Sequence, residues 1–471
     1  MTKTSSLYSY LFILITGIVF FGSSIGCANI IPPTGGPRDS LPPVLMTAAP
    51  RDSATNFTGD RIVLNFDEFV DVQNTFENVL VSPTPNNIPV INYHFRTVTI
   101  KIKDTLEPNT TYSINFGNSI KDVNEGNILK NFTYVFSTGR TLDQNTFSGK
   151  VILAETGKVD STLLVVLHRN LDDSAVVKEK PRFIAKLDGQ GNFEFRNLPE
   201  GIFALYAIPN EFSRRYDDTT KPFAFADKPI STTDNTPVTL LAYTLPKRDT
   251  ARPANKTAAP ESGKKGDKDK ALRFQANFDG RKQDLLDSLK LTFNREIKTF
   301  DTSKIKLADK AFRPVGNYKI IADTNNTRFT IIHNWPANTD FNLIIDKTAF
   351  ADTAGIMLAK NDTLEFTTKQ NEDYGTVRLR FRNLDLAKNP VLQIVSNEAI
   401  IESIPLTQRE WNRKLFNPGE YELRILYDNN KNGIWDPGKF FGTRVQPETV
   451  ITLSKKLAVR ANWDNENDIA L

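Results

Sequence analysis

One run of nine residues in the chain has the spacing of a calcium-binding loop. Its oxygen-bearing positions 1, 3, 5, 7 and 9 are occupied by Asp428, Asn430, Asn432, Ile434 (through its carbonyl) and Asp436. Gly433 falls at the position where such a loop turns sharply. Because Ca²⁺ prefers oxygen ligands, this spacing predicts a calcium site.

The run departs from the calcium pattern at its last position. A bidentate Glu is expected there, and the chain has Lys439 instead. Only two carboxylates remain, so calcium would be held weakly. The run also fits a tight turn between strands, because Asn and Gly readily adopt positive φ. Both interpretations stay open, and Trp435 within the run is expected to be a packing anchor rather than a ligand-stacking residue.

The remaining polar residues give no pattern of a catalytic site. Asp67 and Glu68 are adjacent, so on a strand they would point to opposite faces. The second half of the chain has Asn294 and Arg295 at the matching places. No phosphate-binding loop, nucleophile elbow or zinc-protease motif occurs. We therefore expect no catalytic residues, no enzymatic activity and no cofactor beyond the calcium ion considered above.

Histidines are too few and too scattered for a zinc site or a hydrolase triad. The chain has three of them, namely His94, His168 and His333. His168 ends a strongly apolar run, so it is expected to be a strand histidine whose ring nitrogens are satisfied.

The charge balance argues against a nucleic-acid partner. The chain has 59 Lys and Arg against 55 Asp and Glu, a formal net charge of +4. The stretch 246–271 alone carries eight basic and four acidic residues, which accounts for that excess. The rest is balanced, and nucleic-acid surfaces are strongly basic.

The N-terminus has the pattern of an export signal. Lys3 is followed by the apolar run Leu11–Phe21 and then by small residues that end at Cys27. Cys27 is the only cysteine of the chain, which excludes a disulfide framework. An uncleaved membrane helix over Leu7–Ile25, or an ordinary signal with a chance cysteine, would also fit these residues.

The residues before Cys27 resemble the lipobox of bacterial lipoproteins, although Ser24 stands where that family prefers Leu. The resemblance implies that residues 1–27 are a lipoprotein signal peptide and that Cys27 is acylated, for example with palmitate. The Pro- and Gly-rich stretch 28–41 would then be an extended tether between the lipid and the first domain.

The body of the chain has the period-two pattern of β-strands. Arg61–Phe66, Thr97–Ile102 and Thr111–Phe116 alternate or are rich in β-branched residues, and turn signals separate them. No sustained helical period occurs outside the signal. This pattern predicts an all-β protein built from sandwiches.

The first half of the body repeats in the second half. Ile62–Glu68 parallels Leu289–Arg295, and Pro108–Ile114 parallels Ala337–Leu343. The runs "IVLNFDE", "DVNEG" and "FTYVFSTG" in the first copy resemble bacterial Ig-like domains of the SbsA type. The resemblance covers residues 42–140 and, less closely, 272–369. It implies seven-stranded sandwiches that act as spacers or adhesion modules and share no catalytic residues.

A second kind of module follows each Ig-like segment. The run Leu187–Gly201 joins an Asp- and Gly-rich turn, an aromatic strand and a Leu-Pro-Glu-Gly turn. This run is similar to carboxypeptidase-regulatory-like, or transthyretin-like, sandwiches. The resemblance implies a sandwich of this kind at residues 145–245. Leu415–Arg424 is its weaker counterpart in 373–471, since the first hairpin signature is missing there.

We therefore expect four tandem β-sandwich domains, Ig-like and transthyretin-like in alternation. Their order is sandwich A (42–140), sandwich B (145–245), a charged flexible linker (246–271), sandwich A′ (272–369) and sandwich B′ (373–471). The linker has no aromatic residue and too little apolar surface to fold.

The function expected from this organisation is spatial rather than catalytic. We expect a lipid-anchored spacer and interaction (adhesion-type) protein of the bacterial cell envelope, in the outer membrane. Its partners would be the membrane, through the lipid, and other envelope proteins or glycans. The alternatives are a glycan-binding surface lipoprotein, for which Trp335, Trp411 and Trp435 are the candidate stacking residues, and an accessory part of a carbohydrate-active enzyme system.

Overall fold

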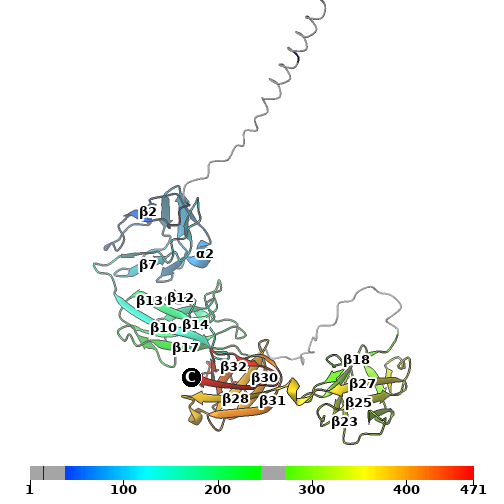
Figure 1. Cartoon of the computed structure of the whole chain (residues 1–471). Coiled ribbons are helices and arrows are strands. Elements are labelled where there is room, and N and C mark those ends of the chain that lie inside the picture. The colour runs from blue at the N-terminus through cyan, green and yellow to red at the C-terminus, as the bar shows by residue number, and fades with distance from the viewer. Residues whose placement is uncertain (1–13, 15–37, 246–270) are drawn as a thin grey trace, which may run out of the picture. The chain divides into compact units, whose positions relative to one another are not determined.

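The computed structural model describes residue 14, residues 38–245 and residues 271–471 (Figure 1). The predicted signal peptide, Cys27, most of the tether and the linker up to residue 270 lie outside this part of the chain. The described residues form two compact units, 1–142 and 143–471, and strands dominate both. The prediction of an all-β fold of tandem sandwiches is confirmed. No helix among the described residues is long and apolar enough to cross a membrane.

Sandwich A forms the first unit. Its strands are β1 (Leu45–Ala49), β2 (Arg61–Phe66), β3 (Val70–Val72), β4 (Leu80–Ser82), β5 (Val90–His94), β6 (Thr97–Lys101), β7 (Thr111–Asn115), β8 (Ile120–Asp122) and β9 (Thr133–Ser137). They form the sheets β1-β2-β6-β5 and β4-β7-β9 and the pair β3-β8, beside the one-turn helix α2 (Thr75–Asn78). Ile62 and Leu64 of β2 point into the core while Arg61 is exposed, which is the alternation expected for a half-buried strand.

Sandwich A′ has the same strand order in the second unit. Its strands are β18 (Phe274–Ala276), β19 (Lys282–Gln283), β20 (Leu289–Phe293), β21 (Ile297–Phe300), β22 (Ile305–Asp309), β23 (Lys319–Ala322), β24 (Arg328–Ile332), β25 (Asp340–Ile345), β26 (Phe350–Asp352) and β27 (Asp362–Thr368). The sheet β18-β20-β24-β23 corresponds to β1-β2-β6-β5, and the pair β21-β26 corresponds to β3-β8. The repeated motifs therefore occupy equivalent strands.

Sandwich B pairs a three-stranded sheet with a larger one. Its strands are β10 (Asn145–Leu153), β11 (Leu164–His168), β12 (Phe183–Lys186), β13 (Asn192–Leu198), β14 (Ile202–Ile208), β15 (Ala224–Phe225), β16 (Ile230–Ser231) and β17 (Val238–Ala242), with helix α3 (Ala175–Lys178). The sheets are β13-β10-β17 and β12-β11-β14-β15, with β16 beside β14. The last strand, β17, runs parallel to β10.

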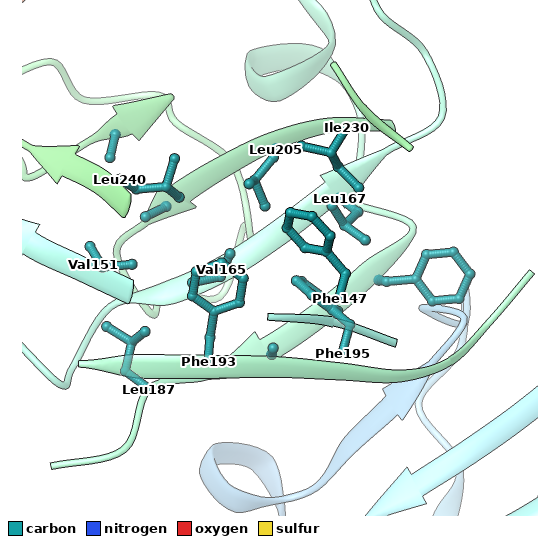
Figure 2. Close-up of a cluster of buried hydrophobic side chains, with 14 of the residues drawn as sticks. Phe147, Val151, Val165, Leu167, Leu187, Phe193, Phe195, Leu205, Ile230 and Leu240 are labelled. Carbon is teal, nitrogen blue, oxygen red and sulfur yellow. The ribbon is translucent and has the colours of Figure 1, made fainter. Parts of the chain in front are cut away.

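Side chains from both sheets of sandwich B fill one core between them (Figure 2). Phe147 and Phe193 come from the smaller sheet, and Val165 and Leu205 come from the larger one. Gly149 of β10 is required by the packing, because a Cβ there would lie 2.2 Å from the Val238 carbonyl oxygen.

Sandwich B′ repeats the strand order of sandwich B. Its strands are β28 (Gly375–Arg382), β29 (Pro390–Ser396), β30 (Ala399–Pro405), β31 (Glu410–Phe416), β32 (Gly419–Tyr427), β33 (Thr449–Thr452), β34 (Leu457–Val459) and β35 (Asp464–Ala470). The sheets are β31-β28-β35 and β30-β29-β32-β33, and β35 runs parallel to β28 as β17 does to β10. Arg380 of β28 forms ion pairs with Glu466 and Asp468 of β35, which favours this register.

Sandwiches B and B′ are in direct contact. The ring of Phe440 lies 5.5 Å from the ring of Tyr206 and 5.1 Å from those of Phe223 and Phe225. Phe440 is 3% exposed, so the contact removes it from water. The linker and sandwich A′ therefore form an insertion between two domains that touch.

Polar contacts surround this aromatic cluster. Arg444 forms an ion pair with Asp173, and the amide of Gln446 donates to Asp227 at 2.7 Å. The N–H of Val450 in β33 donates to the carbonyl of Ala154 at 2.9 Å. These bonds fix the direction in which sandwich B′ meets sandwich B.

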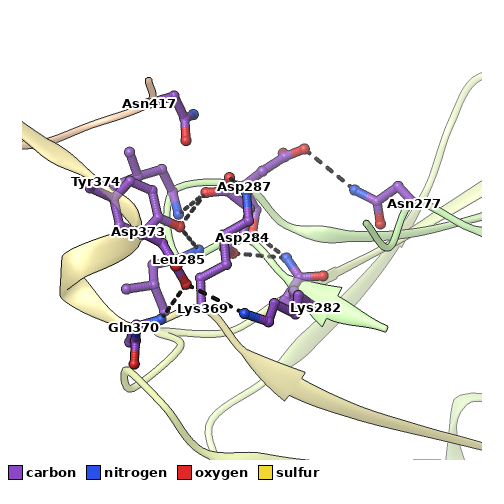
Figure 3. A network of polar contacts seen from close by, with 12 residues as sticks. Asn277, Lys282, Asp284, Leu285, Asp287, Lys369, Gln370, Asp373, Tyr374 and Asn417 are labelled. Carbon is purple, nitrogen blue, oxygen red and sulfur yellow. Dashed lines mark hydrogen bonds and ion pairs between the residues drawn. The ribbon is translucent and has the colours of Figure 1, made fainter. Parts of the chain in front are cut away.

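A buried tyrosine joins sandwich A′ to sandwich B′ (Figure 3). Tyr374 is 2% exposed, its hydroxyl donates to Asp284 at 2.9 Å, and it accepts the N–H of Leu285 at 2.7 Å. Lys369 pairs with the same carboxylate at 3.1 Å. Burial, and to a lesser degree Asp284, raises the pKa of Tyr374, so the hydroxyl stays protonated and able to donate.

The contact between B and B′ can be tested at one ring. Phe440→Ala removes the ring contacts with Tyr206, Phe223 and Phe225 and is expected to weaken the contact by about 3 kcal/mol. Hydrogen exchange at the amide of Val450 should then accelerate, since that N–H is bonded across the contact. Phe441→Ala is the control, because Phe441 is 43% exposed, and it should change this exchange far less. Equal exchange in the wild type and Phe440→Ala would contradict the contact.

Candidate functional site

The predicted calcium loop lies between β32 and β33 and is closed by its own hydrogen bonds. Asp428 is 1% exposed, and its carboxylate accepts the N–H groups of Lys431 at 2.6 Å and Gly433 at 2.7 Å. Lys431 and Gly433 both have positive φ, of 62° and 81°. Positive φ at these two positions and N–H groups that donate to Asp428 are features of a turn.

The two asparagines of the loop turn their amide groups toward its last carboxylate. Asn430 and Asn432 donate to Oδ2 of Asp436 at 2.6 and 2.8 Å. The Oδ1 of Asn432 accepts the N–H of Ile434 at 2.8 Å. The loop therefore brings the predicted residues together around Asp436.

A third carboxylate, missed in the sequence, reaches this loop from the start of β33. Glu448 is 4% exposed, and it accepts the N–H of Asn429 at 2.6 Å and that of Asp436 at 3.1 Å. Burial, and then the carboxylates of Asp428 and Asp436, raises the pKa of Glu448. The loop pattern itself has two carboxylates, and Glu448 adds a third from outside it. Lys439, at the predicted twelfth position, instead pairs its backbone with Val445.

The tryptophans do not form the stacking surface that a glycan-binding protein would need. Trp335 is 5% exposed and lies in the core of sandwich A′, so its prediction as a stacking residue is wrong. Trp411 is partly buried beside the core of B′. Trp435 donates its indole N–H to the Glu448 carbonyl at 2.7 Å, which fits the predicted packing anchor. Trp463, which lies outside the predicted stacking residues, is 61% exposed.

His168 lies at the end of β11 and is 1% exposed. Its ring contacts that of Tyr206 at 5.8 Å between centroids. Among the described residues its Nε2 has no hydrogen-bond partner, so the expectation of a fully satisfied histidine is wrong. Burial lowers the pKa of His168 to about 4, which keeps the imidazole neutral near neutral pH.

Three carboxylates from two segments of sandwich A lie close together. Glu68, Asp122 and Glu125, here called the acid trio, have carboxylate oxygens within 4.8 Å of one another. Asp122 is 1% exposed and is held by the N–H groups of Gly126 at 2.8 Å and Asn127 at 2.7 Å. These loops meet because β3 pairs with β8, which places Val70 opposite Asp122.

The acid trio is electrostatically unfavourable. Burial raises the pKa of Glu68, and the carboxylates of Asp122, Asp67, Asp39 and Glu125 raise it further. Burial also works against the charge of Asp122, but hydrogen bonds from the N–H groups of Gly126, Glu125 and Asn127 lower its pKa. Asp122 is therefore the fixed anion of the trio, and Glu68 is the residue that faces it.

Sandwich A′ places a cation where sandwich A has Glu68. Val70 pairs with Asp122 in A, and Ile297 pairs with Asp352 in A′. Two residues before these positions stand Glu68 and Arg295. Arg295 donates to the buried carboxylate of Asp352 at 2.9 Å, so in this copy the site is internally neutralised. Hydrogen bonding by the Ile356 N–H, and then Arg295, lowers the pKa of Asp352 against the effect of burial.

The comparisons with known proteins identify one domain. Residues 39–138 match the family described as a bacterial Ig-like domain, which agrees with the resemblance found for sandwich A. A comparison with curated proteins gave no match.

Several solved structures are similar at low identity. The Bacillus anthracis TIE protein is 12% identical over 93% of this chain and 75% of that chain, with a TM-score of 0.16. BcpA, the major pilin subunit of Bacillus cereus, is 11% identical over 70% and 99%, with a TM-score of 0.17. The N-terminal part of the bacterial S-layer protein SbsC is 13% identical over 39% and 44%, with a TM-score of 0.20. At such TM-scores these similarities carry no functional argument.

The role of the guanidinium in sandwich A′ can be measured directly. Arg295→Glu would leave Asp352 buried against a like charge, and we expect a local loss of about 2 kcal/mol. Hydrogen exchange at the amides of Ala354 and Ile356, which donate to Asp352, should accelerate. Lys298→Glu makes the same charge change on exposed β21 and is the control. If both variants exchange alike, the ion pair does not stabilise this loop.

Proposed function

We propose that this chain is a non-catalytic, lipid-anchored module of the bacterial cell envelope that acts as a multi-domain spacer and interaction (adhesion-type) protein. The observation that carries the proposal is the architecture of the described residues. They form four sandwiches, each around its own apolar core, and the first matches the bacterial Ig-like domain family. Ig-like sandwiches hold loops and strand edges at fixed positions, which suits a role in spacing and contact.

The proposal also includes how the chain is anchored and in which membrane. Cys27 is the only cysteine and follows an apolar run, as in a lipobox. A single acyl chain gives only reversible membrane binding, so stable attachment would need a second membrane contact beside one acyl chain on Cys27. We propose the outer membrane as the site, with the SbsA type as the closest description of the Ig-like domains.

The glycan-binding alternative loses its main support in the structure. Its first candidate, Trp335, is a core residue, and Trp435 is fixed by its hydrogen bond to Glu448. We therefore favour protein partners in the envelope over glycans.

The anchoring proposal is tested in cells that express the full chain. Labelled palmitate is expected to enter the wild-type protein and to be absent from Cys27→Ser, which should leave the membrane fraction for the soluble one. A matched control is Ser24→Ala, which keeps the cysteine and should still be labelled. An unlabelled wild-type protein in the cytosol would contradict the proposal.

We also propose that the loop Asp428–Asp436 binds calcium weakly, with Glu448 as the third carboxylate. The support is the burial of Asp428 and Glu448 beside Asp436, an arrangement of like charges that a divalent cation would relieve. Calcium chloride is expected to raise the unfolding midpoint of sandwich B′ relative to a chelator. Glu448→Gln should abolish the shift, whereas Glu420→Gln at the exposed start of β32 should keep it. An unchanged midpoint in the wild type would leave only the tight turn.

A further inference from the structure

Two phenylalanines project into solvent at one end of sandwich A. Phe69 is 46% exposed and Phe95 is 63% exposed, and their rings lie 5.5 Å apart. Phe95 occupies the turn between β5 and β6 with a φ of 54°, a conformation that bulky side chains rarely adopt. The N–H of Val70 donates to the Phe95 carbonyl at 2.9 Å and holds this turn.

Two exposed valines extend this surface. Val123 is 56% exposed, and its N–H donates to the Phe69 carbonyl at 3.0 Å. Val44 is 54% exposed, and its carbonyl accepts the N–H of Asp67 at 3.1 Å. We call Val44, Phe69, Phe95 and Val123 the apolar patch. Apolar surface gathered on the loops of one end of a domain is characteristic of an interaction site.

The apolar patch adjoins the acid trio along the chain. Glu68 directly precedes Phe69, and Asp122 directly precedes Val123. Two arginines lie at this surface and contact it without pairing with the carboxylate of Asp122: Arg96 lies over the ring of Phe69 at 5.5 Å, and Arg38 donates to the backbone carbonyl of Glu125 at 2.9 Å. The equivalent carboxylate in sandwich A′ is neutralised by Arg295. Sandwich A′ therefore shows that a guanidinium fits against the aspartate at this position. Sandwich A has Glu68 where A′ has Arg295.

We propose that the apolar patch and the acid trio form one docking surface for a basic protein segment. An Arg or Lys side chain of the partner would enter the acid trio, as the guanidinium of Arg295 meets Asp352 in sandwich A′, and a neighbouring apolar side chain would pack on Phe69 and Phe95. The proposal rests on the role of the chain as an interaction module and adds the place and the chemistry of the partner.

A basic side chain fits this surface better than a metal ion. The guanidinium is the cation that the same fold binds at this position in its second copy, and guanidinium pairs well with carboxylates. A metal ion would leave the apolar patch uncovered, whereas a peptide covers both parts at once. Charge complementarity of this kind selects partners and orients them.

The experiment uses the full chain and a defined probe. A fluorescent synthetic peptide of alternating Arg and Phe is titrated with the protein, and its anisotropy is measured. Saturable binding that weakens with added salt is expected. A peptide with Glu in place of Arg should bind at least about tenfold more weakly. Equal binding of the two peptides, or no saturable binding of the Arg peptide, would overturn the proposal.

Two variants and a matched control locate the surface. Glu68→Arg supplies the internal guanidinium of sandwich A′ and should weaken peptide binding about tenfold or more. Phe95→Gly removes the ring while suiting the positive φ, so it should weaken binding without loss of fold. Phe312→Gly is the control, because Phe312 is 57% exposed at a φ of 60° in sandwich A′. A control that weakens binding as much as Phe95→Gly would overturn the proposal.

A titration with calcium chloride tests whether the acid trio is a metal site instead. If calcium chloride displaces the peptide from the wild type and stabilises the wild type but not Glu68→Arg, the trio is a metal site and the proposal is overturned. Both variants keep Cys27, so palmitate labelling and membrane fractionation are unaffected by them. A failure of the docking surface is thus separable from a failure of the proposed anchoring.

Discussion

The larger sheet of sandwich B is apolar on both faces, and this constraint explains how the second unit is put together. All five residues of β11 are buried, and six of the seven residues of β14 are buried. One face fills the core of sandwich B, with Val165 and Leu205. The other face carries Tyr206 and needs a cover, because an exposed apolar sheet face of this size would favour aggregation.

Part of that cover comes from sandwich B′. Phe440 reaches the ring of Tyr206, and Arg444 and Gln446 bond to residues at its margin. Sandwich A′ lies between B and B′ in the sequence. It is attached to B′ through the buried Tyr374, so it does not separate B from B′ in the structure. The covering of one sheet face therefore makes B and B′ a single body.

Much of the fold follows from local sequence patterns. The alternation in Arg61–Phe66 and its repeat in Leu289–Phe293 predict equivalent strands, and the structure has them as β2 and β20. Sandwich B′ has the strand order of sandwich B, although the hairpin motif of sandwich B is missing from its sequence. The continuous apolar run of β11 indicates that both faces are buried, but nothing in it identifies Phe440 as a cover. That contact depends on a loop more than 200 residues away.

The sites show the same limit of sequence reasoning. The loop Asp428–Asp436 is local and was found from its spacing, whereas Glu448 lies beyond the twelve-residue pattern and was missed. The acid trio joins loops more than 50 residues apart, so only the pairing of β3 with β8 reveals it. At this site the two Ig-like copies carry opposite charges, Glu68 in A and Arg295 in A′. Arg295 pairs with Asp352 in A′, whereas Glu68 stands at the equivalent position of A and faces Asp122 as a like charge.

The central claim is that sandwiches B and B′ form one body in the full chain. Double electron–electron resonance between spin labels at Ser161 and Lys455, both exposed, tests it most directly in a Cys27→Ser background without other cysteines. The account predicts a single narrow distance distribution that is unchanged by protein dilution. A broad distribution, or one that becomes broad on dilution, would contradict it.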